Sequence, residues 1–105
     1  MFTNTIVIGN WKMKLDYKAS SSLAKKLASN YQNVFRNYHA VSELAVCPDF
    51  LSFATVRTAL KKSPIAVGAQ DAFWEMNGAY TGEISAANVQ SLGGSYVLVG
   101  HSERR

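Results

Sequence analysis

Two polar segments of this 105-residue sequence carry side chains that could act on an anionic substrate with a carbonyl group. Asn10 and Lys12 follow a β-branched run at 5–8, and His101 follows an apolar run at 96–99. Lysine supplies a positive charge, asparagine a neutral hydrogen-bond donor, and histidine a group that donates to a developing oxyanion or relays a proton. Because ligands of α/β proteins bind beyond the carboxyl ends of the strands, we expect these side chains to gather there.

Apolar runs alternate with helical patterns along the chain. Buried strands are predicted at 5–8, 44–47, 65–69 and 96–99. Helices are predicted over 17–31, over 50–61 and after Ser85, with Asp16, Asp49 and Ser85 as their N-terminal caps and Gly93-Gly94 ending the last. The residues expected to face inward are Ala19, Leu23, Leu27 and Tyr31, then Phe53, Val56, Ala59 and Leu60, then Val89 and Leu92.

The predicted order β-α-β-α-β-α-β indicates an α/β fold with a parallel sheet and right-handed crossovers. Such a sheet normally hides both faces and both edges, yet four strands come with only three helices. If the strands stand in sequential order, as in a barrel, the first and the fourth are bare edges, which recruit partners or aggregate. We therefore expect one domain over 1–105 that is a piece of something larger.

Composition narrows the function classes. The chain is 48% hydrophobic with a net charge of +4, and its Lys and Arg residues are scattered in pairs, so we expect no nucleic-acid partner. No apolar run approaches the ~18 residues of a membrane span, and the segment 1–9 lacks the basic residues of a signal peptide. A single cysteine, Cys47, excludes a disulfide within this chain and a site of several thiolates. We expect a soluble, cytoplasmic protein without a bound metal.

Three separated motifs resemble the triosephosphate isomerase family. They are GNWKM at 9–13, GAQ at 68–70 followed by GAYTGEIS at 78–85, and VGHSERR at 99–105. The resemblance covers the whole chain but only the N-terminal part of the family's barrel, about four of its eight βα units. It implies a partial TIM (β/α)8 barrel. It also implies the interconversion of dihydroxyacetone phosphate and glyceraldehyde 3-phosphate, in glycolysis and gluconeogenesis, without metal or cofactor.

The resemblance also implies roles for single residues. Lys12 would hold the phosphate and carbonyl region of the substrate, with Asn10 positioning the substrate beside it. His101 would polarise the carbonyl as a neutral imidazole, for which this family is a standard example. Glu103 would lie near Lys12, and Ser102 beside His101.

A subunit contact is implied for the long connection after 65–69. Gln70 and Glu83 resemble parts of the family's dimer surface, and Thr81 resembles the residue that reaches into the partner's active site. Independently of the resemblance, Trp74 stands beside Phe73, and an exposed aromatic pair suits a protein interface.

The sequence departs from the family in two mild ways and one large one. Lys14 and Asp71 replace asparagines that are common in the family. The family's glutamate base, its mobile lid and its Gly-rich phosphate loops would all lie beyond residue 105. Since a general base contributes about 10²–10⁴-fold, we expect the chain alone to be nearly inactive.

Three functions remain open at this point. The chain could be one piece of an isomerase completed by a C-terminal chain, a non-enzymatic partial barrel that self-associates, or a module that binds phosphate without isomerisation. We expect a homo-oligomer rather than a stable monomer, paired through the bare strands or docked through the loop that holds Trp74. The edge-paired form is favoured, because buried parallel strands lose more in water than a loop does.

Overall fold

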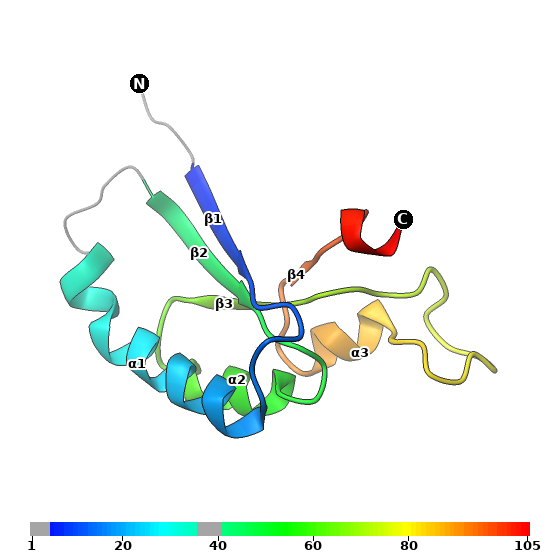
Figure 1. Ribbon diagram of the computed structural model, residues 1–105, viewed down its shortest axis with the longest axis horizontal. Coiled ribbons are helices and arrows are strands. Elements are labelled where there is room, and N and C mark those ends of the chain that lie inside the picture. Colours follow the sequence, from blue (N-terminus) through cyan, green and yellow to red (C-terminus); the bar gives the residue numbers. More distant parts are fainter. Residues whose placement is uncertain (1–4, 36–40) are drawn as a thin grey trace.

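The apolar runs form one parallel sheet in a computed structural model that describes residues 5–35 and 41–105 (Figure 1). The strands stand in the order β1-β2-β3-β4, which is the arrangement of half a TIM barrel. The elements are β1 (Thr5–Asn10), α1 (Tyr17–Phe35), β2 (Val41–Cys47), α2 (Phe53–Ala59), β3 (Ala66–Ala69), α3 (Ala86–Ser91), β4 (Tyr96–Val97) and the 3-10 helix η1 (Ser102–Arg104).

The register aligns the carboxyl ends of the strands at the same end of the sheet. Asn10 at the end of β1 is opposite Cys47 at the end of β2. At the other side, Ala69 of β3 is opposite Val97 of β4. The segments that follow these strands therefore start close together.

Side chains cap the first turns of α1 and α3, as the sequence predicted, whereas the predicted cap of α2, Asp49, is not its N-cap residue. Asp16 Oδ1 accepts a hydrogen bond from the Ala19 amide at 2.8 Å, and Ser85 Oγ accepts one from the Ala87 amide at 3.1 Å. Asp49 Oδ1 accepts from the Ser52 amide at 3.0 Å, so the chain first makes a turn over 50–52. Helix α2 consequently begins at Phe53, three residues later than predicted.

The core lies between the helices and the two central strands. It contains Ala24, Leu44, Val46, Phe53, Val56, Leu60, Ile65, Val67, Ala69 and Val89. The predicted inward face of α2 is confirmed for Phe53, Val56 and Leu60, while Ala59 is half-buried. In α1 the predicted inward face is confirmed for Leu27 and Tyr31, which pack against the core. It is wrong for Ala19, which is exposed, while Ser20 and Ala24 are fully buried.

The outer strands differ most from the sequence-based expectation. The prediction that 5–8 is buried on both faces is wrong: the side chains of Ile6, Val7 and Ile8 are 41–50% exposed. The reason is that β1 pairs with β2 alone and extends away from the helices (Figure 1).

The fourth strand is shorter than predicted, and Val99 is 88% exposed. The amide of Leu98 donates to Ala69 O at 2.9 Å, and β3 offers no residue beyond Ala69 for further pairing. The prediction that Leu92 faces inward is also wrong, because it caps the end of α3 and is 53% exposed.

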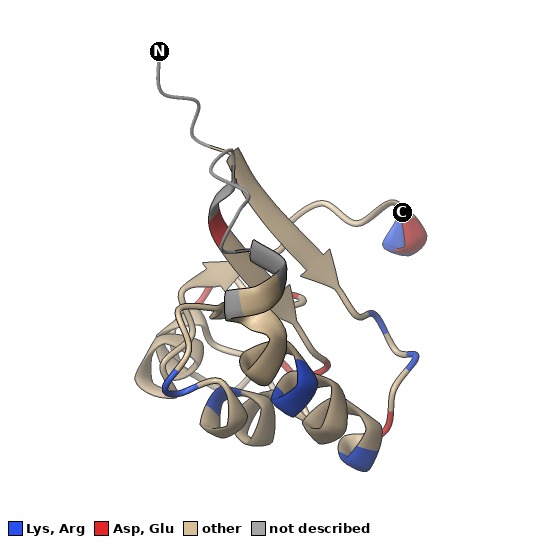
Figure 2. Ribbon diagram, turned by 90° about the vertical axis from the view of Figure 1, so that its left-hand side faces the viewer, with Lys and Arg blue, Asp and Glu red and all other residues tan. Residues whose placement is uncertain are grey.

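Lys and Arg positions are spread over helices and loops of the described part of the ribbon in Figure 2. Among the described residues, no helix is long and apolar enough to cross a membrane. Over the same ranges, no three His, Cys, Asp or Glu side chains come together as metal ligands would.

Gly68 allows β4 to approach β3 closely. A Cβ on this residue would lie 2.9 Å from Tyr96 Cβ and 3.0 Å from Tyr96 O, and also 3.0 Å from Cys47 Sγ. Two of these atoms belong to the backbone or to Cβ and have little freedom to move. Glycine is therefore required for β4, and hence for the segment that carries His101, to reach its place.

We predict that Gly68→Ala destabilises the protein by about 1–3 kcal/mol, the usual cost of overpacking, as measured by the urea midpoint. Gly9→Ala is the matched control on β1. A Cβ at position 9 would lie no closer than 3.7 Å to another atom. That variant should stay within about 0.5 kcal/mol of the unsubstituted protein. Equal stability of the two variants would contradict the close-approach argument.

Candidate active site

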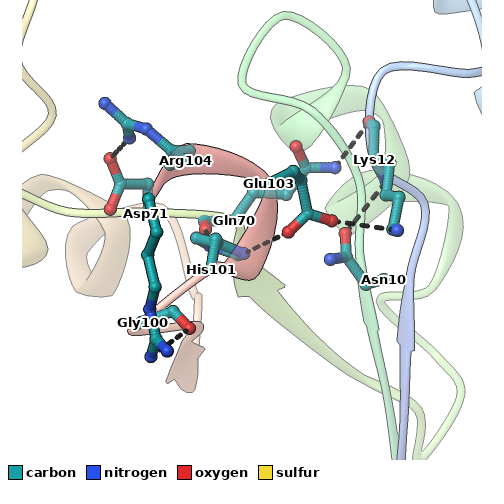
Figure 3. A network of polar contacts seen from close by, with 9 residues as sticks. Asn10, Lys12, Gln70, Asp71, Gly100, His101, Glu103 and Arg104 are labelled. Carbon is teal, nitrogen blue, oxygen red and sulfur yellow. Dashed lines mark hydrogen bonds and ion pairs between the residues drawn. The ribbon is translucent and has the colours of Figure 1, made fainter.

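An open pocket of about 220 Å³ lies at the carboxyl end of the sheet. The segments after β1, β3 and β4 contribute most of its walls (Figure 3). Its lining residues are Asn10, Lys12, Met13, Phe50, Gln70, Asp71, His101, Glu103 and Arg104. Asn10, Lys12 and His101, which were predicted for a substrate site, are thus brought together, although their segments are far apart in sequence. Glu103, predicted to lie near Lys12, lines the same pocket.

Lys12 has an unusual backbone conformation. Its φ of 54° makes it the one non-glycine residue with positive φ among residues 5–35 and 41–105. Asn10 Oδ1 accepts a hydrogen bond from the Lys12 amide at 2.9 Å. Because an amide N–H only donates, the contacting atom of Asn10 is its oxygen, which leaves the Nδ2 protons of Asn10 for a ligand.

Glu103 joins the two sides of the pocket. Its Oε1 lies 2.9 Å from Lys12 Nζ, and its Oε2 lies 3.8 Å from His101 Nδ1. The hydrogen bond from Lys12 is the main cause that lowers the pKa of the Glu103 carboxyl below its usual value. Both side chains are about half exposed (53% and 48%), so solvent screens the pair.

His101 is the least exposed of the charged or titratable groups in this network, with 15% of its side chain accessible. Its Nε2 makes a hydrogen bond with the main-chain oxygen of Gln70. A carbonyl oxygen only accepts, so Nε2 carries the proton in this arrangement. That N–H is the group an imidazole would offer to a substrate carbonyl.

Gln70 was assigned to the subunit contact by resemblance, and the structure places it in this pocket. Its Nε2 donates to Lys12 O at 2.7 Å and to Cys47 O at 3.0 Å, while its main-chain oxygen faces His101. The sequence carried one signal for this position, because Gln70 directly follows the third predicted strand. A second pocket contact that sequence reasoning missed is the ion pair between Asp71 and Arg104.

The remaining predicted residues lie outside the pocket lining. Ser102 is exposed at the start of η1. Trp74, Thr81 and Glu83 are exposed in the connection between β3 and α3. Phe73 packs there between two rings, with centroids 4.5 Å from Trp74 and 4.6 Å from Tyr80. Trp74 is 81% exposed, so this aromatic cluster presents an apolar surface.

Cys47 lies at the end of β2 and is fully buried. Burial raises the pKa of its thiol, which therefore stays protonated and is a poor nucleophile. Cys47 is therefore a small buried residue of the core.

We predict that Lys12→Met raises the pKa of Glu103 towards its usual value, because the hydrogen bond that favours the carboxylate is lost. Because the pKa of Glu103 is lowered in the folded protein, its carboxylate stabilises the folded state at a pH above its unfolded pKa. This contribution is lost as the pH falls through the folded pKa. The titration can be followed by ¹³C NMR of the Glu103 carboxyl group. Lys14→Met is the matched control on the same loop and should leave the titration unchanged. An unshifted Glu103 in Lys12→Met would show that the ion pair does not form.

Comparisons with known proteins agree with the motifs. The family model described as triosephosphate isomerase matches residues 5–105. Curated triosephosphate isomerases from Leifsonia xyli subsp. xyli and Moorella thermoacetica are 44% and 43% identical over 102 and 100 residues. These matches cover 95% of this chain but 39% and 38% of those proteins.

A solved structure has the same fold. The crystal structure of triosephosphate isomerase from Bartonella henselae superimposes with a TM-score of 0.79 at 30% identity, over 95% of this chain and 39% of that one. The chain thus spans about two-fifths of the length of these relatives. It belongs to the triosephosphate isomerase family, and it corresponds to the N-terminal part of the family's barrel.

Proposed function

We propose that this chain supplies the carbonyl-polarising half of a triosephosphate isomerase site and depends on further strands for the other half. The observation that carries the proposal is the common pocket of Lys12 and His101. An ammonium group and an imidazole N–H there converge on a space of about 220 Å³. The reaction would serve glycolysis and gluconeogenesis in the cytoplasm.

In the proposed mechanism the substrate is a phosphorylated triose, and its anionic group is bound by the Lys12 ammonium. The substrate carbonyl replaces Gln70 O as the acceptor of the His101 Nε2 proton. As a proton leaves the adjacent carbon, negative charge develops on the carbonyl oxygen, and the N–H stabilises the resulting enediolate. Asn10 donates to the substrate through Nδ2. No step needs a metal or a cofactor.

A base for the carbon-bound proton has to come from elsewhere. The two carboxylates that line the pocket are both engaged, Glu103 with Lys12 and Asp71 with Arg104. The hydrogen bond from Lys12 lowers the pKa of Glu103, which makes this carboxylate a weaker base. The family's glutamate base, which the sequence does not supply within 1–105, would fill this role in a completed barrel.

The test is an isomerase assay of the chain alone and of a completed barrel, in which this chain is joined to the remaining part of the Bartonella henselae enzyme. We expect no turnover above background for the chain alone and measurable turnover for the completed barrel. Turnover by the chain alone that disappears in His101→Gln would contradict the dependence on further strands. A completed barrel that folds but remains inactive would contradict the proposed function.

The roles of the two residues predict different kinetic losses in the completed barrel. Lys12→Ala should raise KM by about 10- to 100-fold, because a charged hydrogen bond to the substrate anion is lost. His101→Gln should lower kcat by about 10²–10³-fold, because the donor to the developing oxyanion is lost. Lys14→Ala is the control and should change neither constant. Unchanged kinetics in either site variant would contradict its assigned role.

Self-association is a second candidate property, favoured by the half-exposed apolar side chains of β1 and by the aromatic cluster around Trp74. We expect light scattering at micromolar concentration to detect a species larger than an 11.5 kDa monomer. The variant Trp74→Asp would dissociate a dimer docked through the loop and leave an edge-paired dimer intact. A monodisperse monomer would contradict the expectation.

A further inference from the structure

The backbone of Lys12 needs to be held in place. Left-handed conformations are sterically unfavourable for residues with a Cβ and persist only where the surroundings fix them. At φ 54° Lys12 has such a conformation, and it belongs to a loop rather than to a regular element. Rotation of its backbone would swing the side chain and move the ammonium group away from the pocket.

Two side-chain amides hold the two polar backbone groups of this residue. Asn10, two positions earlier, accepts from the Lys12 N–H. Gln70, 58 residues later, donates to the Lys12 carbonyl at 2.7 Å. The first contact is local and would move with the loop. The second ties the loop to the end of β3, which belongs to the buried centre of the sheet.

The chemistry of the Gln70 contacts restricts which side chain can make them. Lys12 O and Cys47 O are both acceptors, so the atom between them has to supply two protons. A primary amide nitrogen does so without carrying a charge. Cys47 O also accepts from the Trp11 amide at 3.0 Å, which brings the start of the Lys12 loop to the same point.

We propose that Gln70 is a positioning residue for Lys12: its amide fixes the strained loop on the ends of β2 and β3 and so directs the ammonium group into the pocket. The role rests on the proposed function of the pocket. It differs from a place in a subunit contact, because it acts within one chain and through Lys12. Gln70 does not itself need to touch the substrate through this amide.

The test compares Gln70→Leu with Gln90→Leu in the completed barrel. The first variant keeps a side chain of similar size and removes the amide, and the second removes an exposed amide from α3. For Gln70→Leu we expect kcat/KM to fall by about 10- to 100-fold, mainly through KM, as expected for a misplaced binding group. Gln90→Leu should match the unsubstituted protein.

A second readout needs no activity. If the Lys12 ammonium leaves its place in Gln70→Leu, the pKa of Glu103 should rise as it does in Lys12→Met. A loss of stability with unchanged KM and unchanged Glu103 titration would show a merely structural role and overturn the proposal. If the unsubstituted completed barrel is inactive, the proposed function fails, while the Glu103 titration still decides whether Gln70 positions Lys12.

Should Gln70→Leu fail to fold, Gln70→Asn decides by the same measurements. It retains the amide but is shorter by one methylene group, so it cannot span Lys12 O and Cys47 O as Gln70 does. A rise in KM and in the Glu103 pKa is expected, and wild-type values of both would overturn the proposal.

Discussion

The carboxyl end of this sheet depends on the hydrogen bonds of Gln70, which connect segments that the strands alone do not join. Two strands separate β1 from β4, so Lys12 and His101 follow the two outer strands of the sheet. Gln70 lies between them, with its side chain on the Lys12 and Cys47 carbonyls and its main-chain oxygen on His101. The ion pair between Lys12 and Glu103 is half exposed and screened by salt and water. We therefore attribute the geometry of the pocket mainly to the neutral contacts and its electrostatics to the ion pair.

The open sheet explains the one-sided core. β2 and β3 are covered by helices and buried, whereas β1 leaves apolar side chains in water. The outer strands of an open parallel sheet carry unpaired backbone N–H and C=O groups, which tend to pair with further strands. Under the proposed function, the strands that complete the barrel would also supply the base. Structural completion and catalytic completion would thus be one event, in which the added strands cover β1 and β4 and bring a free carboxylate to the pocket.

Local rules predicted the features that depend on neighbouring residues. Asp16 and Ser85 cap as expected, since capping needs only an acceptor beside the first free amides. Asp49 instead accepts from the Ser52 amide in the turn before α2, whose N-cap residue is Ser52. The motifs around Lys12 and His101 gave the family and the end of the sheet to which they belong. Burial of β1 was mispredicted, because a β-branched run does not show how many neighbours its strand will have. The contact of Gln70 with Lys12 was missed for a similar reason: it joins residues 58 positions apart, and neither the positive φ of Lys12 nor the reach of the amide is visible locally.

The central claim is that the ends of these strands place a protonated Nε2 of His101 where a substrate oxygen can replace Gln70 O. The most direct measurement is the ¹⁵N NMR spectrum of the His101 ring in the completed barrel at neutral pH, with and without a phosphorylated enediolate mimic. We predict a proton on Nε2 in both states and an Nε2–H signal that shifts when the mimic binds. A proton on Nδ1 alone, or an Nε2 signal that does not respond to the bound mimic, would contradict the claim.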